Sequence, residues 1–206
     1  MQHVAHIQTH YVGMDPDERI IYIQTNDQSL DAYRILGYDL EKNTMSVIFD
    51  RPGLWSVADV AGDGVLLLMR SLSNTAFEYA TYEPKKNIYT PMIGQGEMVD
   101  YQARFGRTSR ELIVATTKFD NYRRLYRFVD GAWSPLTPEE PFEIDDFMVS
   151  KSHSRVVYAV NEHGYMRVKC LDLGSGYITT PLLPDSADIV TPRDSSEDGV
   201  RSVLNI

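Results

Sequence analysis

The sequence predicts an all-β fold, a β-propeller built from four-stranded antiparallel blades, with about four and a half blades present. Two observations predict it. A run of aliphatic and β-branched residues recurs at a nearly constant spacing, and turn-forming residues separate each run from its neighbours. The runs cover residues 19–25 (RIIYIQT), 64–70 (GVLLLMR), 110–116 (RELIVAT), 155–161 (RVVYAVN) and 199–205 (GVRSVLN). Their first residues lie 45, 46, 45 and 44 positions apart, a period that is typical of propeller blades.

Another strand is expected before each run, with a turn between the two. These turns are rich in Gly, Asp and Ser, because Gly tolerates positive φ while Asp and Ser side chains bond to nearby backbone groups. The turns are expected at residues 15–18, 61–63, 106–109, 150–154 and 195–198. The strands that precede them are expected at residues 4–7, 55–60, 101–105, 145–149 and 188–191.

Two more strands follow each of the first four runs, and a tight turn joins them. The third strands are expected around residues 33–40, 77–82, 124–129 and 165–173. The tight turns are expected at residues 41–43, 85–87, 130–131 and 174–176. The fourth strands are expected at residues 45–49, 88–93, 133–136 and 177–182. Short strands with turn residues at every break complete the pattern of a blade.

The domain expected from this pattern is a single, partial propeller over residues 1–206. Its blades are expected at approximately 1–50, 51–96, 97–141 and 142–184, with an incomplete one at 185–206. Alternating β and α units are disfavoured because no long stretch shows 3.6-residue periodicity, and a sandwich gives no reason for the repeat. Three explanations account for an open arc of blades. The chain can be a fragment of a longer protein, which we favour, a partner can complete the ring, or strand exchange can close a small ring. Uncovered blade flanks and an open strand edge predict possible self-association.

Charge and composition exclude several classes of partner. The chain carries 20 basic and 29 acidic residues, a net charge of −9, which disfavours nucleic acid. Its densest basic group, Arg123 and Arg124 with Arg127 nearby, is too small for a nucleic-acid footprint. No apolar run is long enough for a membrane span, and the first residues do not resemble a signal peptide. We therefore expect no membrane partner and a cytoplasmic location. The single cysteine, Cys170, has no partner for an intramolecular disulfide and is expected to be a half-buried strand residue.

No residue is predicted to be catalytic, and neither a metal nor a cofactor is expected. A hydrolase nucleophile requires G-x-S-x-G, and the string around Ser175 has the wrong spacing and lies in a turn. His3, His6 and His10 could suggest a metal, but strand alternation places the first two on opposite faces. The other two histidines, His153 and His163, are expected in turns, where Gly164 supplies the positive φ after His163.

Three further groups have structural interpretations that we favour over functional ones. The densest acidic stretch, at residues 139–146, is expected to be a solvated connection between blades, although its charges could attract the amino ends of peptides. Residues 122–126 (YRRLY) could bind an acidic partner, but strand alternation favours tyrosines on one face and Arg123 with Leu125 on the other. Trp55 and Trp133 are expected to pack between blades.

Blades three and four carry a recognisable pattern over residues 117–173, which is clearest at residues 160–173 (VNEHGYMRVKCLDL) and present again at residues 133–137 (WSPLT). This stretch resembles the N-terminal propeller of prolyl oligopeptidase-family serine peptidases, and the resemblance is good over roughly residues 100–190. It implies a non-catalytic domain that gates or positions peptide substrates for an α/β-hydrolase domain of the same protein. The alternative is a free-standing TolB-like or WD-repeat-like propeller that binds a protein partner as an interaction scaffold. A third hypothesis is an independent enzyme whose active site is formed by propeller loops, and no group of residues in the sequence supports it.

Overall fold

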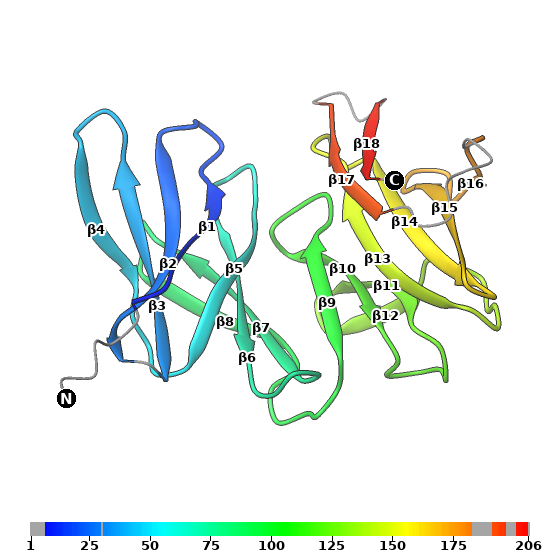
Figure 1. Ribbon diagram of the computed structural model, residues 1–206, viewed down its shortest axis with the longest axis horizontal. Helices are drawn as coiled ribbons and strands as arrows, with labels where there is room; N and C mark the ends of the chain where they lie inside the picture. Colours follow the sequence, from blue (N-terminus) through cyan, green and yellow to red (C-terminus); the bar gives the residue numbers. More distant parts are fainter. Residues whose placement is uncertain (1–6, 30, 183–190, 197–200, 206) are drawn as a thin grey trace. The chain divides into compact units, whose positions relative to one another are not determined.

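The structure, a computed structural model, describes residues 7–29, 31–182, 191–196 and 201–205. All regular elements assigned in these ranges are β-strands, and most consecutive strands pair to form antiparallel meanders (Figure 1). The all-β fold class predicted from the sequence is confirmed. The described part of the chain contains no helix with the length and apolarity needed to cross a membrane. By its contacts the chain divides into two compact units, residues 1–101 and 102–206.

The first unit contains eight strands that form two consecutive four-stranded meanders. The first meander comprises β1 (Thr9–Met14), β2 (Ile20–Ser29), β3 (Ala32–Asp39) and β4 (Thr44–Phe49). The second comprises β5 (Leu54–Val60), β6 (Leu66–Ser71), β7 (Phe77–Glu83) and β8 (Ile88–Ile93). A single parallel pair, Tyr33 with Leu54, links β3 to β5, and the Tyr33 amide donates to the Gly53 carbonyl at 2.9 Å.

The second unit repeats the arrangement and adds a hairpin. One four-stranded sheet comprises β9 (Tyr101–Phe105), β10 (Glu111–Thr116), β11 (Arg124–Val129) and β12 (Ala132–Pro135). The next comprises β13 (Glu143–Val149), β14 (Arg155–Glu162), β15 (Tyr165–Asp172) and β16 (Ile178–Thr179). The hairpin pairs β17 (Thr191–Ser195) with β18 (Ser202–Asn205). Four complete sheets and two further strands agree with about four and a half blades. Their organisation as one partial domain with the predicted boundaries stays a prediction.

The second and third strands of the four complete sheets begin within two residues of their predicted positions, and the clearest correction concerns the first strand. It was expected at residues 4–7, but β1 covers Thr9–Met14; residues 4–6 lie outside the described residues, and Ile7 precedes the strand. The turn before β2 explains the difference. Asp15 accepts hydrogen bonds from the amides of Arg19 and Ile20 at 2.7 and 2.6 Å, so the residues directly before it pair with β2.

Smaller corrections concern the last strands. The fourth strand of the fourth sheet was expected over residues 177–182, but β16 contains only Ile178–Thr179. The first strand of the final hairpin was expected at residues 188–191, and a turn from residue 195. β17 instead runs through Thr191–Ser195, and residues 188–190 lie outside the described residues. Beyond this point the apolar alternation is weak, so the sequence offers little to fix strand ends.

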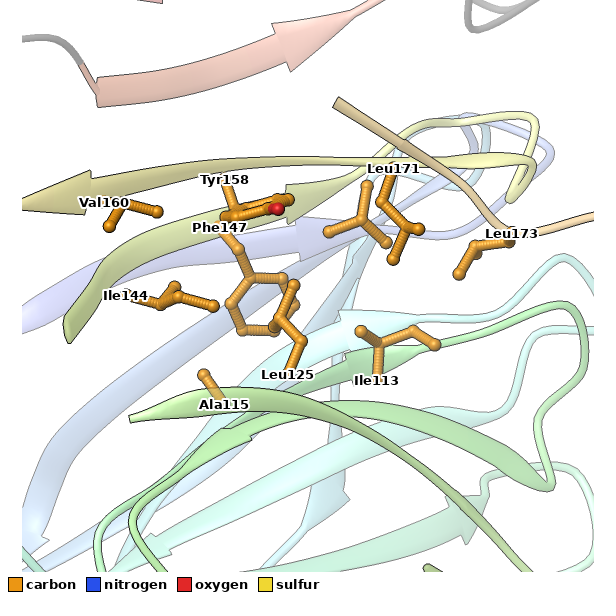
Figure 2. Packing of buried hydrophobic residues seen from close by; sticks show 10 residues of the cluster. Ile113, Ala115, Leu125, Ile144, Phe147, Tyr158, Val160, Leu171 and Leu173 are labelled. Atoms are coloured by element: carbon orange, nitrogen blue, oxygen red, sulfur yellow. The ribbon is translucent and has the colours of Figure 1, made fainter. Parts of the chain in front are cut away.

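The cores form where successive sheets pack face to face. In the second unit, Ile113 and Leu125 from one sheet meet Phe147, Tyr158 and other side chains from the next, and Figure 2 shows these groups directed into the same space. All six residues of β10 are buried, as expected for a strand covered on both faces. A comparable cluster in the first unit comprises Tyr22, Ile35, Phe49, Trp55, Val57, Leu66, Leu68 and Tyr82.

The turn between β3 and β4 is stabilised by polar contacts of Asp39. The Asp39 carboxylate accepts hydrogen bonds from the amides of Glu41 and Lys42 at 3.1 and 3.0 Å and forms an ion pair with Arg19 at 3.1 Å. These bonds, with the Lys42 amide first and Arg19 second, hold the pKa of Asp39 well below its ordinary value of 3.8. A group with a lowered folded-state pKa stabilises the fold above its unfolded pKa. That contribution is lost as the pH falls through the folded pKa.

Replacing Asp39 with asparagine is therefore expected to lower the thermal unfolding midpoint by an amount that depends on pH. The difference from the parent protein should be constant above about pH 5 and should narrow as the pH falls below the unfolded Asp value of about 3.9. Thermal melts at several pH values measure it. The matched control is Asp17→Asn, in the exposed turn before β2. A difference for Asp39→Asn that is equal at pH 3 and pH 7 would contradict this account.

Candidate functional site

The structure disperses the residues that sequence analysis singled out for possible chemistry. Cys170 lies half-buried in β15, and burial raises the pKa of its thiol, which disfavours the nucleophilic thiolate. Ser175 lies in the turn after β15, where its hydroxyl donates to the Asp172 carboxylate at 2.9 Å. Both environments are those of structural residues.

The described histidines lie on separate strands and turns. His10 is exposed in β1 and pairs with Gln24 in the ladder, while His3 and His6 lie outside the described residues. His153 and His163 both adopt positive φ in turns, and the His163 ring packs edge-on against Phe142 at 5.0 Å. A search of the described residues finds no group of three or more His, Cys, Asp or Glu side chains that could hold a metal ion.

The acidic stretch at residues 139–146 has separate contacts instead of forming a carboxylate pair with a common ligand. Glu140 forms an ion pair with Lys169 at 2.7 Å. The Asp146 carboxylate accepts a hydrogen bond from the Gln102 side chain at 2.9 Å, and the Asp145 carbonyl accepts one from Arg123 at 3.3 Å. These contacts connect the stretch to neighbouring strands. They are consistent with a structural role for these charges.

The aromatic and basic residues near β11 are packed or paired. β11 begins at Arg124, as predicted for the third strand, so the alternation expected over residues 122–126 applies only from Arg124. Arg124 forms an ion pair with Asp120 at 3.1 Å. Leu125 and Tyr126 are both buried. Trp133 packs against the rings of Phe119, Tyr126 and Phe128, whereas Trp55 joins the core between the first two meanders. The inter-sheet packing predicted for Trp55 is thus confirmed.

A cleft that the sequence did not reveal lies within the first unit. It has a volume of about 280 Å³ and forms where the β2–β3 turn meets the connection from β4 to β5. Its lining is Thr25, Asp27, Gln28, Ser29, Ala32, Tyr33, Arg34, Asp50, Arg51 and Pro52. In the second unit, the analogous place beside Thr137 and Pro138 leaves only about 10 Å³, scarcely room for one water molecule.

One wall of the cleft is held by a neutralised ion pair. Arg34 donates to Asp27 through Nε at 2.8 Å and through Nη2 to the second carboxylate oxygen. The Arg34 hydrogen bond lowers the pKa of Asp27, so both groups stay charged at neutral pH. The Tyr33 hydroxyl donates to the Gln8 side-chain oxygen at 2.6 Å. The Gln8 backbone N–H donates to the side-chain oxygen of the buried Asn26, also at 2.6 Å. These bonds fix the shape of the wall.

Arg51, which also lines the cleft, has different surroundings. Its guanidinium lies 4.1 Å from the centroid of the Tyr89 ring and 5.6 Å from that of Phe49. Phe49 packs edge-on against Trp55 at 5.0 Å, so the ring beneath the arginine belongs to the core. Arg51 is exposed and forms no ion pair with another described residue. The cleft therefore contains one arginine that is held in an ion pair, Arg34, and one that forms no ion pair with a described residue, Arg51.

Comparisons with known proteins address the fold. No protein-family model matches the chain, and no curated protein matches it. Among solved structures, TolB from Acinetobacter baumannii is 18% identical with a TM-score of 0.65, and the match covers 96% of this chain and 51% of that one. A prolyl endopeptidase structure is 14% identical with a TM-score of 0.74, covering 91% of this chain and 30% of that one.

A third similar structure is described as a propeller. The β-propeller domain of the Trilobed protease from Pyrococcus furiosus is 12% identical with a TM-score of 0.63, covering 84% of this chain and 56% of that one. The chain thus spans about half the length of TolB and less than a third of the prolyl endopeptidase. At these identities the likeness concerns the fold alone. Together with the four-stranded antiparallel sheets, it shows that the chain has a β-propeller fold.

Proposed function

We propose that this chain is the non-catalytic propeller domain of a prolyl oligopeptidase-like serine peptidase, where it gates or positions peptide substrates. The observation that carries the proposal is the match to a prolyl endopeptidase, which covers 91% of this chain but 30% of the other protein. This is the relation expected between one domain and a larger enzyme. The catalytic serine, its base and its oxyanion hole would then belong to an α/β-hydrolase domain.

The segment that resembles the peptidase family supports the proposal through its structure. Residues 160–173 form the end of β14, a two-residue turn and β15. Both turn residues, His163 and Gly164, have positive φ, at 55° and 92°, as a type I′ hairpin requires. The Asn161 side chain accepts a hydrogen bond from the Gly164 amide at 2.9 Å. The resemblance therefore concerns how the blade is built, which suits a domain without chemistry of its own.

The second candidate is a free-standing TolB-like or WD-repeat-like scaffold that binds a protein partner. It is favoured by the match to TolB, which extends over 96% of this chain with 18% identity. Both candidates agree with the propeller fold and with the absence of a G-x-S-x-G motif from residues 1–206. They differ in whether a hydrolase domain accompanies the propeller. A cytoplasmic location stays a prediction in either case.

The test is a peptidase assay on the full-length natural gene product, with residues 1–206 alone and a variant lacking them as controls. A succinyl-Gly-Pro-p-nitroanilide substrate reports hydrolysis, and a fluorophosphonate probe labels an activated serine. We expect hydrolysis and labelling by the full-length product and neither by residues 1–206. Loss of gating in the deleted variant should let it cleave unfolded proteins that the full-length enzyme excludes. A full-length product with no hydrolysis and no labelling would refute the proposal and favour the scaffold.

A further inference from the structure

We infer that the cleft in the first unit is a binding site for a peptide carboxylate, with Arg51 as the cation that receives it. The choice of a peptide as ligand rests on the proposed function. The choice of a carboxylate rests on the cleft itself. Arg51 is exposed, lines the cleft and forms no ion pair with a described residue.

The position of Arg51 on Tyr89 suits it to carboxylate binding. The Arg51 guanidinium carbon lies over the Tyr89 ring, 4.1 Å from its centroid, and the N–H donors of a guanidinium lie in its own plane. Those donors are then available to form two parallel hydrogen bonds to one carboxylate. Tyr89 is itself supported by Trp55, whose ring centroid lies 6.0 Å away. The cation is thus held on a rigid base, which reduces the entropy lost when a ligand binds.

The remaining charges of the cleft limit what Arg51 would accept. Arg34 is compensated by Asp27 through two hydrogen bonds, so it contributes little free positive charge. Asp50 lines the cleft beside Arg51. Two acidic and two basic residues give these four side chains a formal charge of zero. Asp50 would repel a doubly charged phosphate more strongly than a singly charged carboxylate, so of these two anions the cleft favours the carboxylate.

The size of the cleft agrees with the end or the side chain of a peptide. Its volume of about 280 Å³ lies near the lower limit of small-ligand sites, about 300 to 1,000 Å³. A folded protein partner would require a larger surface. The carboxylate can come from a peptide C-terminus or from an acidic side chain, and the experiment distinguishes the two.

The experiment is a fluorescence titration in a Trp133→Phe background. The chain has two tryptophans, so the remaining one, Trp55, is the reporter, and its indole N–H donates to the carbonyl of Pro52, which lines the cleft. The ligands are acetyl-Ala-Ala with a free C-terminus, acetyl-Ala-Ala-amide and acetyl-Ala-Glu-amide. We expect saturable binding of the free acid and at least tenfold weaker binding of the neutral amide. Binding of the glutamate peptide with an affinity equal to that of the free acid would identify the side chain as a sufficient source. Inorganic phosphate should bind at least tenfold more weakly than the free acid.

Variants assign the site to Arg51. Arg51→Met should weaken binding of the free acid at least tenfold, and Arg51→Lys, which keeps the charge but loses the planar fork, should fall between. The matched control is Arg167→Met, because Arg167 is also exposed, lies 5.8 Å from a ring centroid, that of Tyr165, and is not one of the residues that line the cleft. Calorimetric titration repeats the measurement without relying on Trp55. Thermal unfolding midpoints of the Met and Lys variants that equal the midpoint of the parent protein show that folding is unaffected.

Several results would overturn the inference. The first is equal affinity for the free acid and the neutral amide. The second is phosphate binding as tight as binding of the free acid. The third is an Arg51→Met variant that binds the free acid as tightly as the parent protein does. Equal binding of acid and amide would leave a peptide-binding propeller intact and remove only the carboxylate site. Absence of binding to all three peptides would also remove the site. The peptidase assay on the full-length product would still decide the proposed function.

Discussion

Truncation of Leu125 to alanine is expected to lower the free energy of unfolding by about 3 kcal/mol, within the range of about 2 to 5 kcal/mol for buried leucines. Leu125 in β11 is fully buried and belongs to the cluster between two successive sheets (Figure 2). Its loss leaves a cavity that Phe147 and Ile113 can fill only by moving from well-packed positions. Urea denaturation monitored by fluorescence gives the change in free energy.

The matched control for this prediction is Leu182→Ala. Leu182 is fully exposed, with a relative accessibility of 101%, so its truncation should change stability by less than about 0.5 kcal/mol. A loss below about 1 kcal/mol for Leu125→Ala would mean that the sheets do not pack through this cluster. The packing of blade on blade would then need another explanation.

Substitution of Gly94 by alanine is expected to cost about 3 kcal/mol or more. Gly94 follows β8 and has a φ of +89°, a backbone conformation that residues with a Cβ rarely adopt. An added Cβ would lie 2.3 Å from the Phe77 carbonyl oxygen and 3.0 Å from the Glu78 Cα. These contacts are with the backbone of β7, so the strand itself would have to move. Backbone strain and this close contact add to one another. Thermal and urea denaturation measure the loss.

Gly96 provides the control, because it has a similar φ of +74° but no atom within 4 Å of an added Cβ. Gly96→Ala should therefore cost about 1 kcal/mol, the conformational part alone. The difference between the two variants reports the close approach of β7 and the chain after β8. Equal losses for Gly94→Ala and Gly96→Ala would contradict this packing.

Most strands could be predicted because their residues carry the information locally. The second strands contain consecutive aliphatic residues, as expected for strands that are covered on both faces, and in β10 every residue is buried. The turn of His163 and Gly164 could be predicted for the same reason, since glycine marks a residue with positive φ. Local apolar and turn patterns were sufficient for these elements.

β1 was misplaced because its sequence gives a weak signal. Thr9 and His10 are polar and exposed, and Gly13 adjoins an irregularity in the pairing with β2. Its strand conformation comes from β2 across the Asp15 turn, which is a tertiary effect. The apolar residues Val4, Ala5 and Ile7, and the strand expected before each turn, suggested a strand at residues 4–7 instead. The edge of a sheet is where such patterns are least informative.

The cleft could not be predicted because its residues come from two separate turns and follow no spacing pattern. Asp27 and Arg34 are seven positions apart, and Arg51 lies on a different connection. Nothing in the sequence indicates that Arg34 is neutralised while Arg51 rests on a ring. The one available signal was the aromatic residue Phe49 two positions before Arg51, and it fits core packing equally well. The site depends on which turns the sheets bring together.

The central claim is that the chain forms successive four-stranded antiparallel blades, and backbone nuclear Overhauser effects test it most directly. The account predicts cross-strand contacts between Val114 and Tyr126 in β10–β11, and between Ala159 and Val168 in β14–β15. The amides of β10 and β14 should also exchange slowly with solvent, since these strands are buried. Medium-range contacts between residues three apart within either strand, as in a helix, would contradict the fold and the functions inferred from it.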